Sequence, residues 1–169
     1  NWHAGQGCVC VERVYVVDAV KDEFLRLVKA KAEAITVGLD DLVDYGPMTM
    51  PGQIDIIRRH VSDALEAGAT ALVGGLDSIK PPYVHPIVLV DVPEDNAAVC
   101  EETFGPVIVI NTVPDTAEAL RRANATSFGL GSSVFSKHHG EEIAAGIRAG
   151  GVTINAVLTF VGLSSVPFG

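Results

Sequence analysis

The sequence predicts an α/β domain in which helices cover a mainly parallel β-sheet. Three observations favour this class. Short apolar runs alternate with segments of helical periodicity along the chain. Two of the runs, 87–90 and 107–110, are apolar at every position, as expected of strands that are covered on both faces. The chain has 169 residues, of which 48% are hydrophobic, and this is enough to build the core of one domain.

The first half of the chain predicts a strand followed by two helices. The apolar run 14–17 is typical of a buried strand, and helical periodicity begins at Asp22. After the turn-rich stretch 38–50, Pro51 stands near the first turn of an amphipathic helix that ends close to Gly68. The apolar stripe of this second helix consists of Ile54, Ile57, Val61 and Leu65.

The second half predicts further strands and two more helices. Asp115, with Glu118 three residues later, forms an Asp-led variant of a capping box and should open a helix that buries Ala119, Leu120 and Ala123. The next helix carries Ile143 and Ile147 and should end at Gly150. The remaining strands are expected at 70–73, 87–90, 107–110, 132–135 and 152–154.

The charge balance indicates which classes of partner the chain does not suit. Twelve basic and twenty-one acidic residues give a net charge of -9. An acidic surface repels phosphate backbones and anionic lipids, so neither nucleic acid nor a membrane is expected as a partner. No apolar run reaches the roughly 20 residues that span a bilayer.

The three cysteines do not predict a disulfide framework. Cys8 and Cys10 stand two apart, which places both thiols on one face of an extended strand. A closed zinc site needs about four ligands, and Cys100 with scattered histidines would have to supply the others. We therefore expect no metal and a reduced Cys8, as in a cytoplasmic protein.

Two short motifs carry the chemistry. In the cysteine motif (Gly5–Cys8), glycines let the backbone approach a ligand and leave the thiol unobstructed, so that a thiolate could attack a carbonyl. The alternative is a small buried hydrophobic residue. The diglutamate motif (Glu101–Pro106) places two acids before an apolar strand. By itself, such an acid pair is more often a solvated turn.

The two motifs, in this order and at this separation, resemble those of the aldehyde dehydrogenase superfamily, and so does the ending at 166–169. The resemblance extends over essentially all of 1–169 and includes the segments 83–86, 128–130 and 151–155. It implies that the chain is a partial catalytic domain from the latter half of the family's chain. The family's dinucleotide-binding domain would then be absent from this sequence.

The resemblance also implies roles for individual residues. Cys8 would be the catalytic nucleophile, forming a thiohemiacetal and then a thioester, with its own N–H as one oxyanion donor. In the family, the second donor and the general-base glutamate precede the cysteine motif. Glu102 would bind the nicotinamide ribose hydroxyls of NAD or NADP, with Phe104 beside the cofactor. Gln53 aligns with a further ribose contact, although it could also be a solvent-exposed helical residue.

The implied activity is NAD(P)-dependent oxidation of an aldehyde to a carboxylic acid. Two alternatives stay open: an acylating enzyme that passes the thioester to coenzyme A or phosphate, and a catalytically inactive fragment. His3 stands where the family usually has Asn, and it could pair with the thiol or simply be packed or solvated. Family members assemble as dimers or tetramers, and the same is expected of the intact protein. The expected substrate-lining residues are Trp2, Val9, Phe160 and Phe168.

Overall fold

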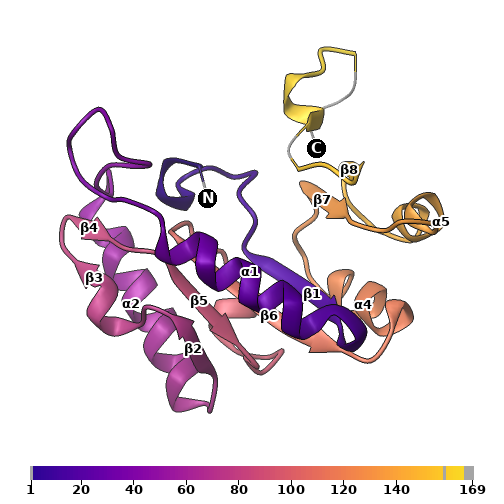
Figure 1. Ribbon diagram of the computed structural model, residues 1–169, viewed down its shortest axis with the longest axis horizontal. Helices are drawn as coiled ribbons and strands as arrows, with labels where there is room; N and C mark the ends of the chain where they lie inside the picture. Colours follow the sequence, from indigo (N-terminus) through magenta and orange to yellow (C-terminus); the bar gives the residue numbers. More distant parts are fainter. Residues whose placement is uncertain (1, 158, 166–169) are drawn as a thin grey trace. The chain divides into compact units, whose positions relative to one another are not determined.

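The computed structural model describes residues 2–157 and 159–165, without the side chains of Trp2 and Phe160. The chain divides into two compact units, Asn1–Thr112 and Val113–Gly169. The elements of the first unit are η1 (Trp2–Gly5), β1 (Arg13–Val17), η2 (Asp18–Val20), α1 (Lys21–Glu33), α2 (Pro51–Glu66), β2 (Thr70–Val73), η3 (Leu76–Ser78), β3 (Ile79–Lys80), β4 (Tyr83–Val84), β5 (Ile87–Val90), α3 (Ala97–Cys100) and β6 (Val107–Val113), which runs to the boundary (Figure 1).

The sheet of the first unit has the strand order β1-β6-β5-β2. Strands β5 and β6 are parallel, with Ile87 opposite Val107 and Val90 opposite Ile110. Strand β2 pairs with β5 in the antiparallel direction. The two fully apolar runs are therefore the central strands, as the sequence predicts, and the sheet is mixed.

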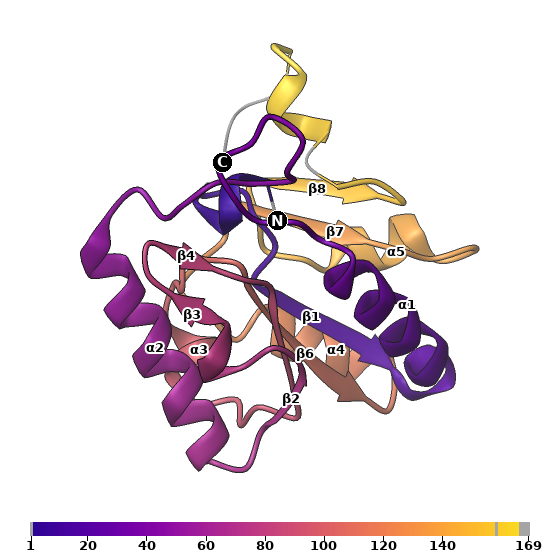
Figure 2. The ribbon, with the colours of Figure 1, turned by 60° about the vertical axis from the view of Figure 1, so that its left-hand side comes forward.

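Successive side chains of β5 point to opposite faces of the sheet. Leu89 packs with Ile57 of α2 in one hydrophobic cluster. Val88 and Val90 pack with Ala32 of α1 in a second cluster. Figure 2 shows α1 and α2 on opposite sides of the sheet. This arrangement confirms the predicted α/β class, in which helices cover both sheet faces.

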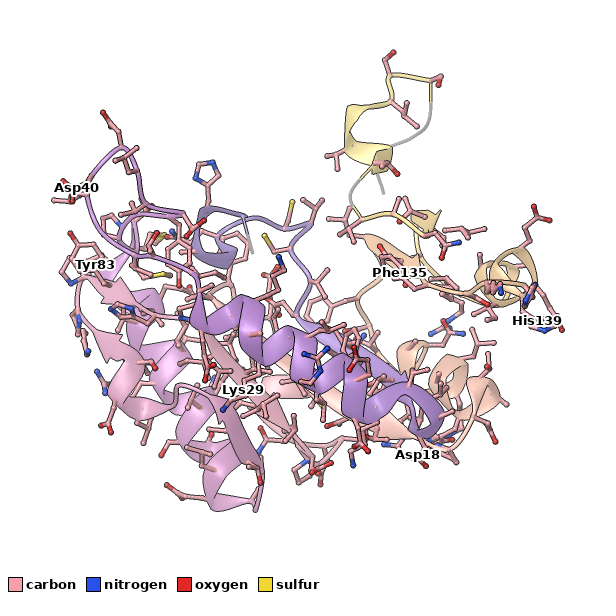
Figure 3. All side chains as sticks on the ribbon, in the orientation of Figure 1. Asp18, Lys29, Asp40, Tyr83, Phe135 and His139 are labelled. Carbon is pink, nitrogen blue, oxygen red and sulfur yellow. The ribbon has the colours of Figure 1, made fainter. Side chains whose placement is uncertain are left out.

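Helix α2 follows the sequence pattern closely. Pro51 occupies the first turn, where its missing N–H costs no hydrogen bond. Ile57 and Val61 are fully buried. Beyond the helix end, Gly68 has φ +97°, a conformation that favours glycine. The turn-rich stretch before α2 is a loop in which Asp40 points away from the first unit (Figure 3).

Helix α3 was not expected from the sequence. It has four residues, and the Asn96 side chain caps it by accepting a hydrogen bond from the Ala98 N–H at 3.0 Å. Asn is among the preferred N-cap residues, so a local signal was present. A single helical turn is too short to produce the apolar periodicity from which the longer helices were predicted.

The second unit contains α4 (Thr116–Ala123), β7 (Gly131–Val134), α5 (Gly140–Ala145), β8 (Gly151–Ile154) and η4 (Thr159–Gly162). Strands β7 and β8 are parallel neighbours. The Asp115 carboxylate accepts a hydrogen bond from the Glu118 N–H at 2.9 Å, which confirms the predicted cap. The sequence predicts that the apolar residues Ala119, Leu120 and Ala123 of this helix are buried. In the structure they are only half-buried.

The predicted end of α5 near Gly150 was wrong, because the helix ends at Ala145. Asn124 supplies the physical reason. Its amide nitrogen donates to the Gly146 carbonyl at 2.8 Å, and its amide oxygen accepts from the Arg148 N–H at 2.8 Å. These bonds satisfy backbone groups that would otherwise continue the helix, and glycine has a low helix propensity.

Candidate functional site

The cysteine motif and the diglutamate motif lie against each other in the first unit. Gly5 has φ +72°, and a Cβ atom built on it would lie 1.9 Å from the Gly105 carbonyl oxygen. A Cβ on Gly105 would in turn lie 2.4 Å from Cδ1 of Ile57. Position 5 therefore requires glycine, and a side chain at position 105 would have to displace the buried Ile57. The contact brings together segments that are about a hundred residues apart.

Gln6 holds the cysteine motif in place. Its side-chain oxygen accepts from the Thr49 N–H at 2.7 Å. Its amide nitrogen donates to the carbonyls of His3, at 3.0 Å, and Pro47, at 3.4 Å. One side chain therefore fastens the loop to the segment that leads into α2.

The two thiols of this region differ in exposure. The Cys8 side chain is exposed, whereas that of Cys10 is half-buried. The Cys10 N–H donates to the Gly7 carbonyl at 2.9 Å, so the chain turns directly after the motif. Of these two thiols, that of Cys8 is the more accessible to an external reagent. The His3 side chain is also exposed, and a pairing with Cys8 stays a prediction.

Every polar group of Thr103, inside the diglutamate motif, has a partner. Its N–H donates to Oε2 of Glu12 at 3.0 Å, and its carbonyl accepts from Nε2 of Gln53 at 2.7 Å. Its hydroxyl lies 3.0 Å from Nδ1 of His60. Thr103 is 2% exposed, so these bonds are shielded from competing water. Side chains of α2 and of the segment before β1 thus hold the motif in place.

The two glutamates of the motif have different environments. Glu101 forms a salt bridge with Arg59 at 2.7 Å and lies 3.2 Å from Nε2 of His60. Arg59 and His60 hold the pKa of the Glu101 carboxyl below its usual value. Burial lowers the pKa of His60, so its ring is neutral near pH 7. Glu101 therefore ties the motif to α2.

Glu102 is exposed, and its carboxylate has no hydrogen bond or ion pair to any described residue. Phe104 is half-buried and has φ +49°. An available carboxylate beside a partly exposed aromatic ring suits a ligand that offers hydroxyl groups and a flat ring. These two residues therefore fit the nicotinamide ribose role that the resemblance assigns to them. That role stays a prediction.

The other predicted residues have different outcomes. Gln53 is half-buried and bonded to the Thr103 carbonyl, so the structure gives it a supporting contact. A ribose contact by Gln53 stays a prediction, as does a substrate-lining role for Val9, which is half-buried. The side chains of Trp2 and Phe160 are outside the described part of the chain, and Phe168 lies outside the described residues altogether.

Three contributors to the site were missed by the sequence reasoning: Gln6, Glu12 and His60. Gln6 had a signal, because it belongs to the cysteine motif. Glu12 and His60 had none, because a lone Glu before a strand and a lone His on an amphipathic helix are ordinary residues. Only the folded chain brings them to Thr103, which is 91 residues from Glu12 and 43 from His60.

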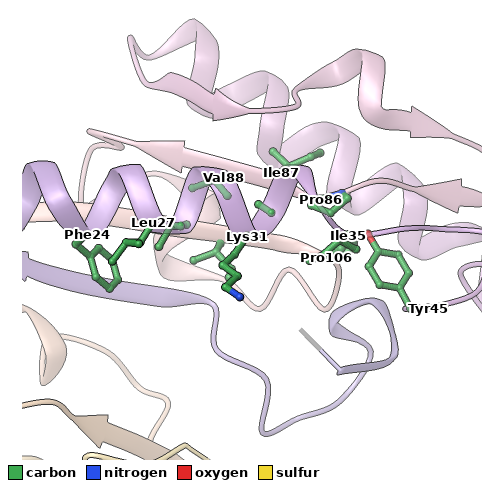
Figure 4. Close-up of a pocket in the computed structure, with 12 residues that line it drawn as sticks. Phe24, Leu27, Lys31, Ile35, Tyr45, Pro86, Ile87, Val88 and Pro106 are labelled. Atoms are coloured by element: carbon green, nitrogen blue, oxygen red, sulfur yellow. The ribbon is translucent and has the colours of Figure 1, made fainter. Parts of the chain in front are cut away.

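A pocket of about 320 Å³ lies elsewhere in the first unit, beneath α1. Figure 4 shows Phe24, Leu27 and Lys31 of α1 among its lining residues. Pro106, the last residue of the diglutamate motif, is among its lining residues, but neither Cys8 nor Glu102 lines it. Within the described residues, no group of three or more His, Cys, Asp or Glu side chains could hold a metal ion. No helix of the described part is both long and apolar enough to cross a membrane.

Comparison with known proteins agrees with the motifs. The family model described as the aldehyde dehydrogenase family matches residues 1–169. A protein of Mycobacterium ulcerans (strain Agy99), named for succinate-semialdehyde dehydrogenase [NADP(+)], is 37% identical over 99% of this chain and 34% of its own length. A 4,4'-diapolycopene aldehyde oxidase from Methylomonas sp is 39% identical over 99% of this chain and 32% of its own length.

A solved structure is similar at the level of the fold. The crystal structure of an NADP-dependent glyceraldehyde-3-phosphate dehydrogenase from Bacillus halodurans C-125, complexed with NADP, superimposes with a TM-score of 0.87 at 34% identity. The similarity covers 92% of this chain and 33% of that chain. The present chain thus spans about a third of the length of the relatives that it matches.

Proposed function

Because the chain belongs to the aldehyde dehydrogenase family, we propose that the intact protein oxidises an aldehyde to a carboxylic acid with NAD or NADP. Residues 1–169 would form part of its catalytic domain, and the dinucleotide-binding domain would lie outside this chain. Cys8 would be the catalytic nucleophile. The observation that carries the proposal is the contact between the cysteine and diglutamate motifs, in which an exposed thiol and an available carboxylate belong to one fixed framework.

The chemistry of Cys8 would proceed in two stages. Its thiolate adds to the aldehyde carbon and gives a thiohemiacetal, whose oxyanion accepts a hydrogen bond from the Cys8 N–H. Loss of hydride from the same carbon leaves a thioester. Water then attacks the thioester carbon, which releases the carboxylic acid and restores the thiol. The second oxyanion donor and the base for the water would come from segments that precede the cysteine motif.

NAD or NADP, when bound, would accept the hydride. The protein's part would be to hold the nicotinamide ribose through the Glu102 carboxylate and to support the ring beside Phe104. Correct placement matters because hydride transfer needs reacting atoms within roughly 3–3.5 Å of one another. The fixed backbone of the diglutamate motif, bonded at every polar group of Thr103, supports this assignment.

The proposal is tested by assaying the intact protein with NAD and NADP and identifying the product. Two relatives are named for succinate semialdehyde and for 4,4'-diapolycopene aldehyde, so these aldehydes are the first to test. A carboxylic acid product supports the proposal. A coenzyme A thioester or an acyl phosphate would indicate acylating chemistry instead. Absence of turnover with a broad panel of aldehydes and both cofactors would contradict the proposal.

We also propose that the intact protein works in a reducing cytoplasm, because an exposed nucleophilic thiol has to stay reduced. Assembly into dimers or tetramers is proposed from the family resemblance. Light scattering on the intact protein at micromolar concentration tests this assembly, and a strictly monomeric active enzyme would contradict it.

A further inference from the structure

Glu12 follows Cys8 by four residues, and its side chain binds two consecutive backbone amides of the diglutamate motif. Oε1 accepts from the Phe104 N–H at 2.7 Å, and Oε2 accepts from the Thr103 N–H at 3.0 Å. Hydrogen bonds to an ionised carboxylate are among the stronger ones in proteins. Each carboxylate oxygen therefore fixes a separate peptide group of the motif.

The bound peptide groups have an unusual conformation. Phe104 has φ +49°, which is uncommon for a residue with a side chain. Such a conformation persists where its surroundings enforce it. The carboxylate of Glu12 contributes to this constraint, because its hydrogen bonds fix the peptide groups on the N-terminal side of Thr103 and of Phe104. The position of the Phe104 Cβ, from which the ring extends, follows from the same backbone turn.

Glu12 is itself anchored to the sheet. Its carbonyl accepts a hydrogen bond from the Val109 N–H of β6 at 2.8 Å. Glu12 thus lies between Cys8 and β1 in the chain while its side chain holds the diglutamate motif. Glu12 therefore connects the segment that carries Cys8 to the segment that carries Glu102. The connection consists of the two hydrogen bonds that its carboxylate accepts.

We propose that Glu12 is a positioning residue that fixes the Thr103 and Phe104 peptide groups and thereby orients the Glu102 carboxylate and the Phe104 ring toward the cofactor. This inference rests on the proposed function. Neither the family match nor the cysteine and diglutamate motifs assigns a role to this residue, which lies outside both motifs.

Partial burial of a charged carboxylate costs free energy, and this cost supports a specific role for Glu12. Burial raises the pKa of Glu12, the hydrogen bonds from Thr103 and Phe104 lower it, the nearby Glu102 raises it, and Arg13 lowers it. A glutamine at position 12 would avoid the cost of a partly buried charge. It would also offer one acceptor oxygen, with its NH₂ group facing one of the two amide N–H groups. Only a carboxylate presents a separate acceptor oxygen to each of the two N–H groups.

The test uses the full-length protein with Glu12→Gln and, as a matched control, Glu94→Gln. Glu94 has a similarly half-buried side chain, which accepts from Tyr15 and Asn111. Hydrogen exchange reports the Thr103 and Phe104 amides, and fluorescence titration reports NADPH binding. Iodoacetamide alkylation followed by peptide mapping reports Cys8, because Cys100 is also exposed. For Glu12→Gln we expect about tenfold faster exchange at both amides and about tenfold weaker NADPH binding. The alkylation rate should stay within about twofold of wild type, and the control should change none of the three.

Different results would contradict the positioning role of Glu12 and the proposed aldehyde oxidation. Unchanged exchange in Glu12→Gln overturns the inference, and so does faster exchange with unchanged NADPH binding. A wild-type protein that binds neither NADPH nor NADH contradicts the proposed function, whereas the exchange result still tests the backbone contact. If Glu12→Gln does not fold, Glu12→Asp replaces it, because the shorter carboxylate keeps the charge but cannot reach both amides. We expect the same direction of change for this variant.

Discussion

Cys8 and Cys10 present thiols of different exposure, and this difference leads to the first prediction. In the intact protein, Cys8→Ser should abolish aldehyde oxidation, because a serine hydroxyl is a far weaker nucleophile without an activating base. NADPH binding should persist, since Cys8 takes part in none of the hydrogen bonds by which the described residues hold the diglutamate motif. Steady-state oxidation and fluorescence titration measure the two properties.

Cys10→Ser is the matched control for this prediction. Its side chain is half-buried beside Gly7, so the replacement should leave turnover within a few-fold of wild type. If Cys10 proved essential and Cys8 dispensable, the alignment of the cysteine motif with the family's nucleophile position would be wrong.

Glu101 and Glu102 provide a second pair of matched variants. Glu102→Gln should slow the first hydride transfer by about tenfold or more, because a loosely held ribose loses the reactive geometry. Glu101→Gln should have a smaller effect on this step, since Glu101 contacts Arg59 and His60 of α2. Rapid-mixing measurement of reduced cofactor compares them. Equal effects from both variants would indicate an acid pair with a purely structural role.

The sequence could propose these residues as candidates, but it could not predict their supporting contacts. A motif names Cys8 and Glu102 because neighbouring residues specify the pattern. The bond from Phe104 to Glu12 joins residues that are 92 apart, and the bond from Thr49 to Gln6 joins residues that are 43 apart. Such pairs depend on the path of the chain through the fold, which local pattern does not contain.

The close approach of the cysteine motif to Gly105 gives a prediction about a loop and its support. Gly5→Ala should push the loop away from the Gly105 carbonyl, because backbone atoms cannot move aside and the position has φ +72°. Release of the loop breaks the bond from the Thr49 N–H to Gln6. Exchange of the Thr49 amide should then become about tenfold faster or more, equivalent to about 1.4 kcal/mol of loop stability.

Gly52→Ala is the control, because a Cβ at Gly52 of α2 would meet nothing within 4 Å. This variant should leave Thr49 exchange unchanged and should stabilise the protein slightly, by up to about 1 kcal/mol. If Gly5→Ala behaved like Gly52→Ala, the contact between the two motifs would be looser than the structure describes.

The bond between α2 and the diglutamate motif makes stability depend on pH. Burial lowers the pKa of His60 below its ordinary value of 6.5. The unfolded chain therefore binds this proton more readily than the folded chain, and stability falls as the pH drops below 6.5. Tm should decrease between about pH 7.5 and 5.5. The slope should be smaller in His60→Gln, which has no ionisable ring. Identical slopes for the two proteins would contradict the assignment of this proton to His60.

The longer elements differ in how well local signals define their ends. Pro51 and Gly68 mark the limits of α2 because each acts through its own backbone conformation. The end of α5 is set instead by Asn124, which lies 22 residues from its partner Gly146. The apolar runs 87–90 and 107–110 could be predicted as strands because strands covered on both faces are apolar. The extension of β6 through Asn111 and Thr112, and the order of the strands in the sheet, required the structure.

The 169-residue chain studied alone should fold and yet show no detectable aldehyde oxidation. Its first unit has two buried hydrophobic clusters on a covered sheet, which supports independent folding. Turnover is not expected, because the chain spans 34% of its Mycobacterium ulcerans relative, and the family's cofactor domain, second oxyanion donor and general base belong to preceding segments. Absorbance of the reduced cofactor measures turnover, and iodoacetamide alkylation of Cys8 verifies that the thiol is available. Sustained turnover by this chain alone would contradict our placement of those parts.

Acid-quenched mass spectrometry can show whether Cys8 forms the covalent bond to the substrate. The intact protein is mixed with an aldehyde that it oxidises and with the cofactor, quenched within the first turnover, and digested. Fragmentation of the peptide that contains both Cys8 and Cys10 then locates any acyl group. We expect an acyl group on the sulfur of Cys8 that requires both aldehyde and cofactor. An acyl group on Cys10, or turnover without a covalent adduct on either cysteine, would contradict the account.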